Sequence, residues 1–149
     1  MHKILVVEDE TSVLQILKKA LESQGYMVIT ADTGETAMNW IKEVSLDLAI
    51  IDLGLPDING VEVCRAIKGN PRTRSTPVII LTGNTTNDAR IESNLGASAE
   101  LFLNKPISIA ELRRAVTQIL EKADKEKMLL RATFKRLAGT NKTTGIPNT

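Results

Sequence analysis

Five short, mostly apolar runs, each followed by polar or turn-forming residues, recur along this 149-residue chain. Runs of this length are too short for most helices, and they are typical of strands buried on both faces of a sheet. We therefore predict a strand at each of them: Ile4–Val7, Tyr26–Ala31, Leu48–Asp52, Val78–Leu81 and Glu100–Asn104.

Between these runs the apolar residues repeat at helical spacing. Thr11 and Ser12 are candidate caps for the first helix and Gly25 a candidate terminator, while Ser108 with Glu111 forms a capping box for the last. Alternating strands and helices with short connections predict a doubly wound α/β fold, with a five-stranded parallel sheet covered by helices on both faces. The predicted helices begin near Thr11, Thr33, Asn59, Thr86 and Ser108, and the last two end near Leu95 and Lys122.

The pattern weakens after Lys122, which divides the chain into a domain at 1–123 and a basic tail at 124–149. Residues 1–123 carry 13 Lys/Arg and 16 Asp/Glu, net −3, whereas 124–149 carry 6 and 2, net +4. In the tail, Leu130, Phe134 and Leu137 fall at i, i+4 and i+7. This segment either extends the last helix and docks on the domain, is disordered, or presents a basic amphipathic face to a partner, membrane or nucleic acid. From Gly139 onward the composition favours disorder.

Composition narrows the function classes. The hydrophobic fraction of 42% and the charged fraction of 25% are ordinary for a globular protein, and the formal net charge of +1 shows no bias towards nucleic acid. Cys64 is the single cysteine, which excludes an intramolecular disulfide and a four-cysteine zinc site. No apolar stretch approaches the roughly 20 residues of a membrane span, so we expect a cytoplasmic protein. The tail is too short for a conventional DNA-binding domain.

Four predicted strands end in reactive groups: Glu8-Asp9, Asp52, Thr82 and Lys105. If these strands are neighbours, the groups converge at one edge of the sheet, where ligands of open α/β sheets bind. Three clustered carboxylates repel one another, and a hard divalent cation such as Mg²⁺ relieves this. The Lys105 ammonium and the Thr82 hydroxyl are suited to phosphoryl oxygens. The set therefore indicates covalent phosphoryl transfer onto Asp52.

At these positions the chain resembles the receiver domain of two-component response regulators, over roughly residues 2–123. The resemblance rests on five elements in order: Glu8-Asp9, Asp52 after an apolar strand, the loop Leu55-Pro56-Asp57-Ile58-Asn59-Gly60, Thr82 after an apolar strand, and Lys105-Pro106 after Phe102. It implies the flavodoxin-like (βα)5 fold of a stand-alone receiver with a helical or disordered C-terminal tail.

The resemblance also implies chemistry. Asp52 would accept a phosphoryl group from a histidine kinase or phosphotransfer protein, with Mg²⁺ held by Glu8, Asp9, Asp52 and the Gly54 carbonyl. Thr82 and Lys105 would hold the phosphoryl oxygens, and Thr82 and Phe102 would switch the surface offered to a downstream protein. Such a module is no enzyme apart from its own phosphorylation and dephosphorylation. The Lys105-Pro106 bond is usually cis in this family.

The chain departs from the family pattern at two places: Ser98-Ala99 stands where Gly-Ala is usual, and Phe102 where Tyr is common. Two other functions compete with the receiver. One is a phosphorylation-independent docking scaffold. The other is a phosphohydrolase of the haloacid-dehalogenase type, which needs a second acid two residues after its nucleophile, where this chain has Gly54.

Overall fold

The sheet has the predicted strands in one parallel layer. The computed structural model describes residues 1–83 and 98–143. The strand order is β2-β1-β3-β4-β5, and every paired neighbour runs parallel. All residues of the inner strands β3 and β4 are buried, as their apolar sequences predict. The strands are β1 (Lys3–Val7), β2 (Met27–Ala31), β3 (Leu48–Asp52), β4 (Val78–Thr82) and β5 (Leu101–Asn104).

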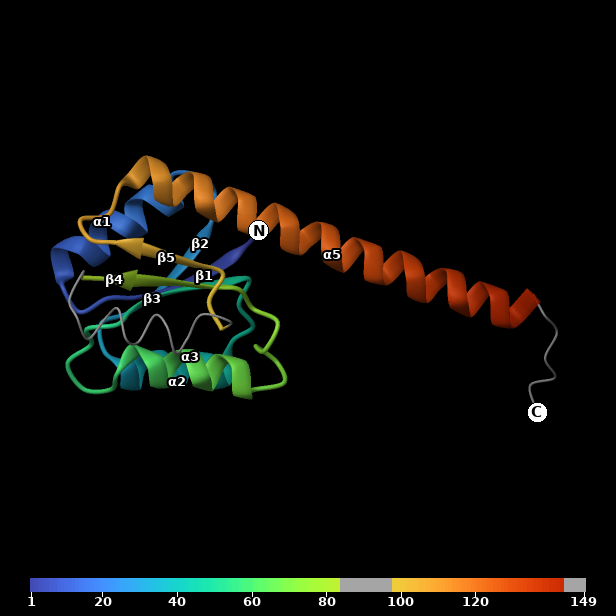
Figure 1. Cartoon of the computed structure of the whole chain (residues 1–149), viewed down its shortest axis with the longest axis horizontal. Coiled ribbons are helices and arrows are strands. Elements are labelled where there is room, and N and C mark those ends of the chain that lie inside the picture. The colour runs from blue at the N-terminus through green and yellow to red at the C-terminus, as the bar shows by residue number, and fades with distance from the viewer. Residues whose placement is uncertain (84–97, 144–149) are drawn as a thin grey trace.

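Helices cover both faces of this sheet, which confirms the doubly wound α/β fold (Figure 1). α1 (Thr11–Glu22) and α5 (Ile109–Thr143) pack on one face, where Leu17 and Val116 join side chains such as Ile50 in one core. α2 (Gly34–Glu43) and α3 (Gly60–Gly69) cover the other face, with the buried Cys64 in the second core. The helix predicted at 86–95 lies outside the described residues.

Local signals set most helix ends as predicted. Gly25 follows α1 with a φ of +91°, a conformation that favours glycine. The Thr33 hydroxyl accepts a hydrogen bond from the Thr36 amide, and Ser108 Oγ accepts one from the Glu111 amide. The cap predicted for α1 is wrong. Glu10 is the extended residue before the helix and makes no side-chain cap bond, because Thr11 already has helical geometry.

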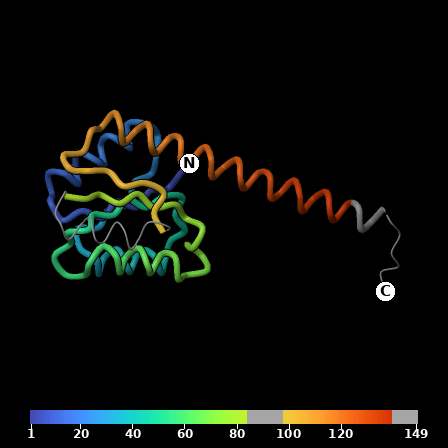
Figure 2. The backbone as a smooth tube through the Cα atoms, viewed as in Figure 1, coloured from blue at the N-terminus to red at the C-terminus, as the bar shows by residue number. Residues whose placement is uncertain are grey.

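The last helix is much longer than predicted. α5 runs for 35 residues to Thr143, instead of ending near Lys122, and projects beyond the domain (Figure 2). Its sequence from 107 to 138 contains neither Gly nor Pro and is rich in Ala, Leu, Lys, Glu and Arg, which are strong helix formers. The tail therefore extends the last helix, which is one of the alternatives predicted for it, and the side chains of residues 124–139 are exposed instead of packing on the domain.

A hydrogen bond and an ion pair attach the start of this projection to the domain. His2 Nε2 lies 2.9 Å from Asp124 Oδ2, and Lys127 Nζ lies 3.7 Å from Asp47 Oδ1. His2 and Asp47 immediately precede β1 and β3, so the helix leaves the domain at the edge formed by the amino-terminal ends of the strands. Among the described helices, none has the length and apolar character required to cross a bilayer.

Candidate functional site

Asp52 is the last residue of the central strand β3, and its side chain lies at the carboxyl edge of the sheet. The residue is 4% exposed. The Gly54 amide donates a hydrogen bond of 3.1 Å to Asp52 Oδ1. Gly60 brings α3 back against this strand, since a Cβ there would lie 2.5 Å from the Asp52 carbonyl oxygen. The loop therefore fixes Asp52 through a close approach of backbone to backbone.

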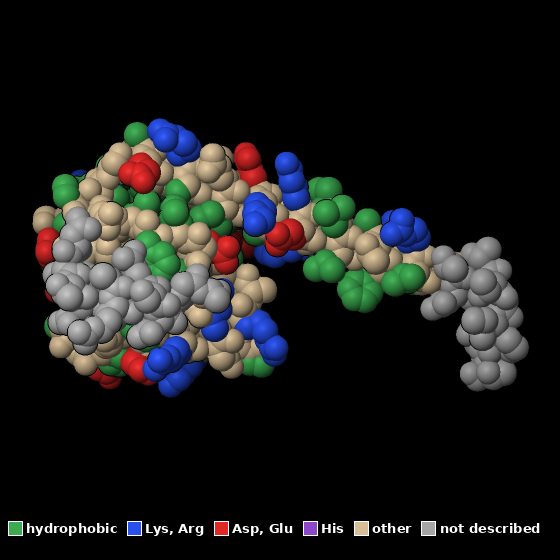
Figure 3. All heavy atoms as spheres, in the orientation of Figure 1, with side chains coloured by type: hydrophobic (Ala, Val, Ile, Leu, Met, Phe, Trp, Pro, Cys, Tyr) green, Lys and Arg blue, Asp and Glu red, His purple; other side chains and the backbone are tan. Residues whose placement is uncertain are grey.

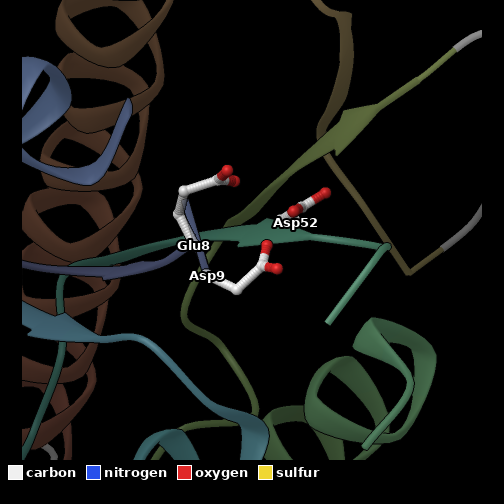
Figure 4. A group of neighbouring side chains, drawn as sticks. All are labelled: Glu8, Asp9 and Asp52. Atoms are coloured by element: carbon white, nitrogen blue, oxygen red, sulfur yellow. The ribbon is translucent and has the colours of Figure 1, made fainter. Parts of the chain in front are cut away.

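Three carboxyl groups gather beside this strand end. Glu8 and Asp9 follow β1, which pairs directly with β3, and the predicted convergence with Asp52 is confirmed. One oxygen from each of the three groups lies within 4.8 Å of the others (Figure 4). Glu8 is fully buried, whereas Asp9 is exposed. The cluster is therefore closed on one side and open to solvent on the other.

Lys105 reaches this cluster from the loop after β5. Its Nζ lies 3.1 Å from both Glu8 carboxylate oxygens and 3.0 Å from Asp52 Oδ2. The peptide bond from Lys105 to Pro106 is cis, as the family resemblance implies. One ammonium thus bridges two carboxylates that belong to neighbouring strands.

The charges at this site perturb one another. Burial, followed by the hydrogen bond and charge of Asp52, raises the pKa of Glu8 to about 7, despite the opposing effect of Lys105. Burial alone lowers the pKa of Lys105, but its contacts with Asp52 and Glu8 outweigh this and raise the pKa above its ordinary value. A single ammonium does not offset three carboxyl groups, so the pocket retains an excess of negative charge.

Thr82 and Phe102 lie on the adjacent strands β4 and β5. The Thr82 hydroxyl is buried and donates a 2.8 Å hydrogen bond to Asn104 Oδ1. Sequence reasoning missed Asn104 as its partner, although both residues end neighbouring strands and pair in register. Phe102 is partly buried and packs against the core beneath α2 and α3.

Asp57 has a structural role that the sequence analysis did not assign. Its carboxylate accepts hydrogen bonds from the Gly34 amide at 2.8 Å and the Glu35 amide at 3.0 Å, at the start of α2. These amide contacts, that of Gly34 foremost, hold the pKa of Asp57 below its usual value. The loop after Asp52 is thereby tied to a second helix. The Asp57-to-Gly34 pairing depends on tertiary structure and leaves no local signal.

The donor set fits a hard divalent cation. The three carboxyl groups offer oxygen ligands within reach of one point, the pocket has excess negative charge, and its exposed side admits the waters that Mg²⁺ retains. Glu8, Asp9 and Asp52 are the residues that could hold such an ion. Gly54 lies directly beside them: a Cβ at this position would be 3.8 Å from Asp52 Oδ1. No acidic side chain therefore stands where a phosphohydrolase of the dehalogenase type requires one.

Known proteins share this architecture. The family model described as the response regulator receiver domain matches residues 4–117. The transcriptional regulatory protein KdpE of Mycobacterium tuberculosis is 34% identical over 134 residues, which are 87% of this chain and 58% of that protein. The chain thus spans little more than half the length of this curated relative.

Two solved structures extend the comparison. A CheY-like response regulator receiver domain protein of Methanospirillum hungatei is 31% identical, with a TM-score of 0.75, over 85% of this chain and 98% of that one. The receiver domain of the sensor histidine kinase PA1611 of Pseudomonas aeruginosa is 30% identical, with a TM-score of 0.73, over 80% and 98%. That structure contains a magnesium ion coordinated in the active site cleft.

Proposed function

The chain belongs to the family of response regulator receiver domains, and we propose that it is controlled by phosphorylation of Asp52 by a histidine kinase or phosphotransfer protein. The observation that supports this most directly is the contact of Lys105 Nζ with both Asp52 and Glu8, beside the exposed Asp9. A nucleophilic carboxylate, a cation for phosphoryl oxygens and a candidate metal site then surround one point.

In the proposed reaction, an Asp52 carboxylate oxygen forms a bond to phosphorus as the bond from phosphorus to the donor's histidine nitrogen breaks. Mg²⁺ bound by Glu8, Asp9 and Asp52 would supply positive charge for the transferring phosphoryl group. Lys105 is already within 3.0 Å of Asp52, so a small movement brings its ammonium to a phosphoryl oxygen. The Gly54 amide, which now donates to Asp52, keeps the carboxylate oriented.

In this proposal Thr82 holds a phosphoryl oxygen and also connects Asp52 to the surface. Its hydroxyl donates to Asn104 in the unmodified protein, so donation to a phosphoryl oxygen requires that bond to break. Phosphorylation would then exchange the Asn104 contact for a charge-assisted one, which is stronger. Because Asn104 and Phe102 are on the same short strand, β5, this exchange is a route from Asp52 to the outer surface. A downstream protein would recognise this surface.

A groove next to the site provides a surface for the phosphodonor. It has a volume of about 660 Å³ and runs between α1 and the loop from Lys105 to Ile109. Its lining is mainly apolar, with Val13, Ile16 and Ile107, and Ile16 is 54% exposed. We propose that a helix of the donor protein docks here, which would bring its phosphohistidine to Asp52.

The test of phosphoacceptance compares wild type with Asp52→Asn in labelling by a small phosphodonor such as acetyl phosphate. We expect stoichiometric, Mg²⁺-dependent labelling of wild type and none of the variant. Asn is nearly isosteric, so circular dichroism should show an unchanged fold. Stoichiometric labelling of Asp52→Asn would assign the phosphoryl group to another residue.

The donor groove is tested separately with Ile16→Asp. We expect this variant to accept phosphoryl groups from acetyl phosphate at the wild-type rate, but more slowly from a purified histidine kinase that phosphorylates wild type. Equal rates from the kinase would show that the donor docks elsewhere, while leaving Asp52 as the acceptor.

A further inference from the structure

The projecting part of α5 carries large apolar side chains that its own domain does not cover. Leu130 is 59% exposed, Phe134 70% and Leu137 55%. We call these three residues the distal stripe. Their spacing of four and three residues places them on one face of the helix. Side chains of this size are usually buried in monomeric proteins, so an unpartnered row of them marks an interaction surface.

The distal stripe continues the face by which α5 packs on its own domain. Leu112, Val116 and Ile119 pack in the core shared with α1. Each lies eighteen residues before a member of the stripe, and eighteen residues are about five complete helical turns. The stripe therefore points to the same side of α5 as the domain does. Figure 3 shows hydrophobic side chains along the lower edge of the projecting helix, on the side where the domain lies, and others on the opposite edge near the start of the projection.

This geometry restricts what can cover the stripe. The domain extends away from α5 on the stripe's side and forms a corner with the projecting helix (Figure 1). A flat surface such as a bilayer would meet the domain before it reached the stripe. A single helix, which is about 10 Å across, fits into such a corner.

The charges favour the same conclusion. Lys125, Lys135 and Arg136 lie more than about 120° around the helix from the centre of the stripe, at 100° per residue, so they face away from it. A helix lying on an anionic membrane instead needs its cations beside its apolar face. Lys127 and Arg131 border the stripe on one side and Glu126 on the other, and Lys127 pairs with Asp47 of its own domain. The covering partner thus meets an apolar row that is flanked by charges of both signs and not by cations alone.

We propose that the distal stripe pairs with the distal stripe of a second copy of this chain, with the two helices antiparallel. A parallel partner would need its own residues 109–123 in space that the first domain occupies, because the stripe and the domain share one side. An antiparallel partner brings only the tip of its helix into that corner. The domains then lie at opposite ends of the helix pair.

The position of the stripe supports this register. The part of α5 beyond residue 123 runs to Thr143, and the midpoint between Leu130 and Leu137 is also the midpoint of that segment. Full antiparallel overlap of the two projections therefore places Leu130 of one copy opposite Leu137 of the other, with the two Phe134 rings at the centre. Any other overlap shortens the contact or moves these residues out of line.

The pairing leaves the phosphorylation site open. The helix leaves the domain at the amino-terminal edge of the sheet, beside His2 and Asp47, whereas Asp52 lies at the carboxyl edge. Because α5 is already helical, association does not require the helix to form first, which reduces its entropic cost. The contact is short, with three large apolar residues per copy, so we expect a weak dimer.

Sedimentation equilibrium of the full chain tests the proposal, from about 1 µM to about 1 mM, a range that brackets weak specific association. We expect a reversible monomer–dimer equilibrium. The triple variant Leu130→Gln, Phe134→Gln, Leu137→Gln should weaken it roughly a hundredfold or more, since six large apolar side chains lose their partners. Glutamine preserves helix propensity. A monomer over the whole range, or a triple variant that dimerises like wild type, overturns the proposal.

The matched control is the double variant Met128→Gln, Leu129→Gln. These residues are 69% and 67% exposed on the same helix, but they lie about 100° or more from the centre of the stripe. We expect the wild-type dissociation constant, and an equal loss of dimer would show that general hydrophobicity causes association. Cosedimentation of the monomer with phosphatidylglycerol vesicles, if lost in the triple variant, would also contradict the proposal.

Disulfide cross-linking tests the antiparallel register. Leu130→Cys and Leu137→Cys chains are prepared separately and then oxidised alone or as a mixture; the native Cys64 is buried and does not compete. We expect the mixture to cross-link more efficiently than either chain alone. More efficient cross-linking within each pure chain would indicate a parallel pair and overturn the register. All these readouts use unphosphorylated protein, so they succeed or fail independently of the role of Asp52.

Discussion

Glu8 should make the metal-free protein less stable as the pH rises, and Glu8→Gln should remove this effect. Burial, followed by the Asp52 carboxyl group, raises the pKa of Glu8 from 4.5 to about 7 in the folded protein. Between these values the folded protein binds a proton on Glu8 that the unfolded chain has lost. Stability changes with pH according to this difference in bound protons, so it falls as the pH rises through the window.

The magnitude follows from the two pKa values. A change from about pH 5 to about pH 8 should lower the free energy of unfolding by roughly 2 to 3 kcal/mol through Glu8 alone. Glutamine has nearly the same volume and no charge to desolvate. In chelator-treated protein, Glu8→Gln should therefore lose less stability over this range and be the more stable protein near pH 8.

Urea unfolding followed by circular dichroism, at several pH values with EDTA, measures this difference. Glu43→Gln is the matched control, because it removes a carboxyl group from an exposed position at the end of α2. We expect the control to keep the wild-type slope. With saturating Mg²⁺, wild type should gain stability as Glu8 loses its proton, and Glu8→Gln should gain less. Parallel pH profiles for wild type and Glu8→Gln in EDTA would refute the reasoning.

Three further substitutions separate structural from chemical roles. Gly60→Ala should lower the free energy of unfolding by about 2 kcal/mol, because its Cβ would lie 2.5 Å from the Asp52 carbonyl oxygen. Urea unfolding measures this loss, and Gly69→Ala is the control because a Cβ there meets nothing within 4 Å. Lys105→Met should destabilise the metal-free protein by about 2 kcal/mol at neutral pH, since Glu8 and Asp52 lose their shared cation. Mg²⁺ should restore part of this stability. A variant as stable as wild type in EDTA would contradict this prediction. Thr82→Val removes one hydrogen bond to Asn104 and should change the free energy of unfolding by about 1 kcal/mol or less. The same variant should be labelled at Asp52 by acetyl phosphate roughly tenfold more slowly than wild type. Labelling at the wild-type rate would show that Thr82 does not contact the phosphoryl group.

The strand pattern predicted both the fold and the neighbourhood of Asp52 because the relevant information is local. Apolar runs such as Leu48–Asp52 identify buried strands, and alternating helices require a parallel sheet. In a parallel sheet all carboxyl ends of the strands lie at one edge. Placing a reactive residue at the ends of four strands therefore predicts that these residues converge: Glu8, Asp52, Thr82 and Lys105. The continuation of α5 past Lys122 was one of the alternatives left open for the tail, and local propensity favours it because residues 107–138 contain neither Gly nor Pro.

Tertiary structure decided which groups touch. The contact of Lys105 with Glu8 spans 97 residues of sequence, and that of Asp57 with Gly34 spans 23, so neither has a local signature. The same holds for the bond from Thr82 to Asn104, which depends on the register of β4 and β5. Burial is likewise a property of the folded molecule. The repeat of Leu130, Phe134 and Leu137 shows that they share a face. Their exposure follows only from the folded structure, in which the surface of the domain ends before it reaches these side chains. Periodicity is fixed by the covalent order of residues, whereas contact and exposure depend on where the rest of the chain lies in space.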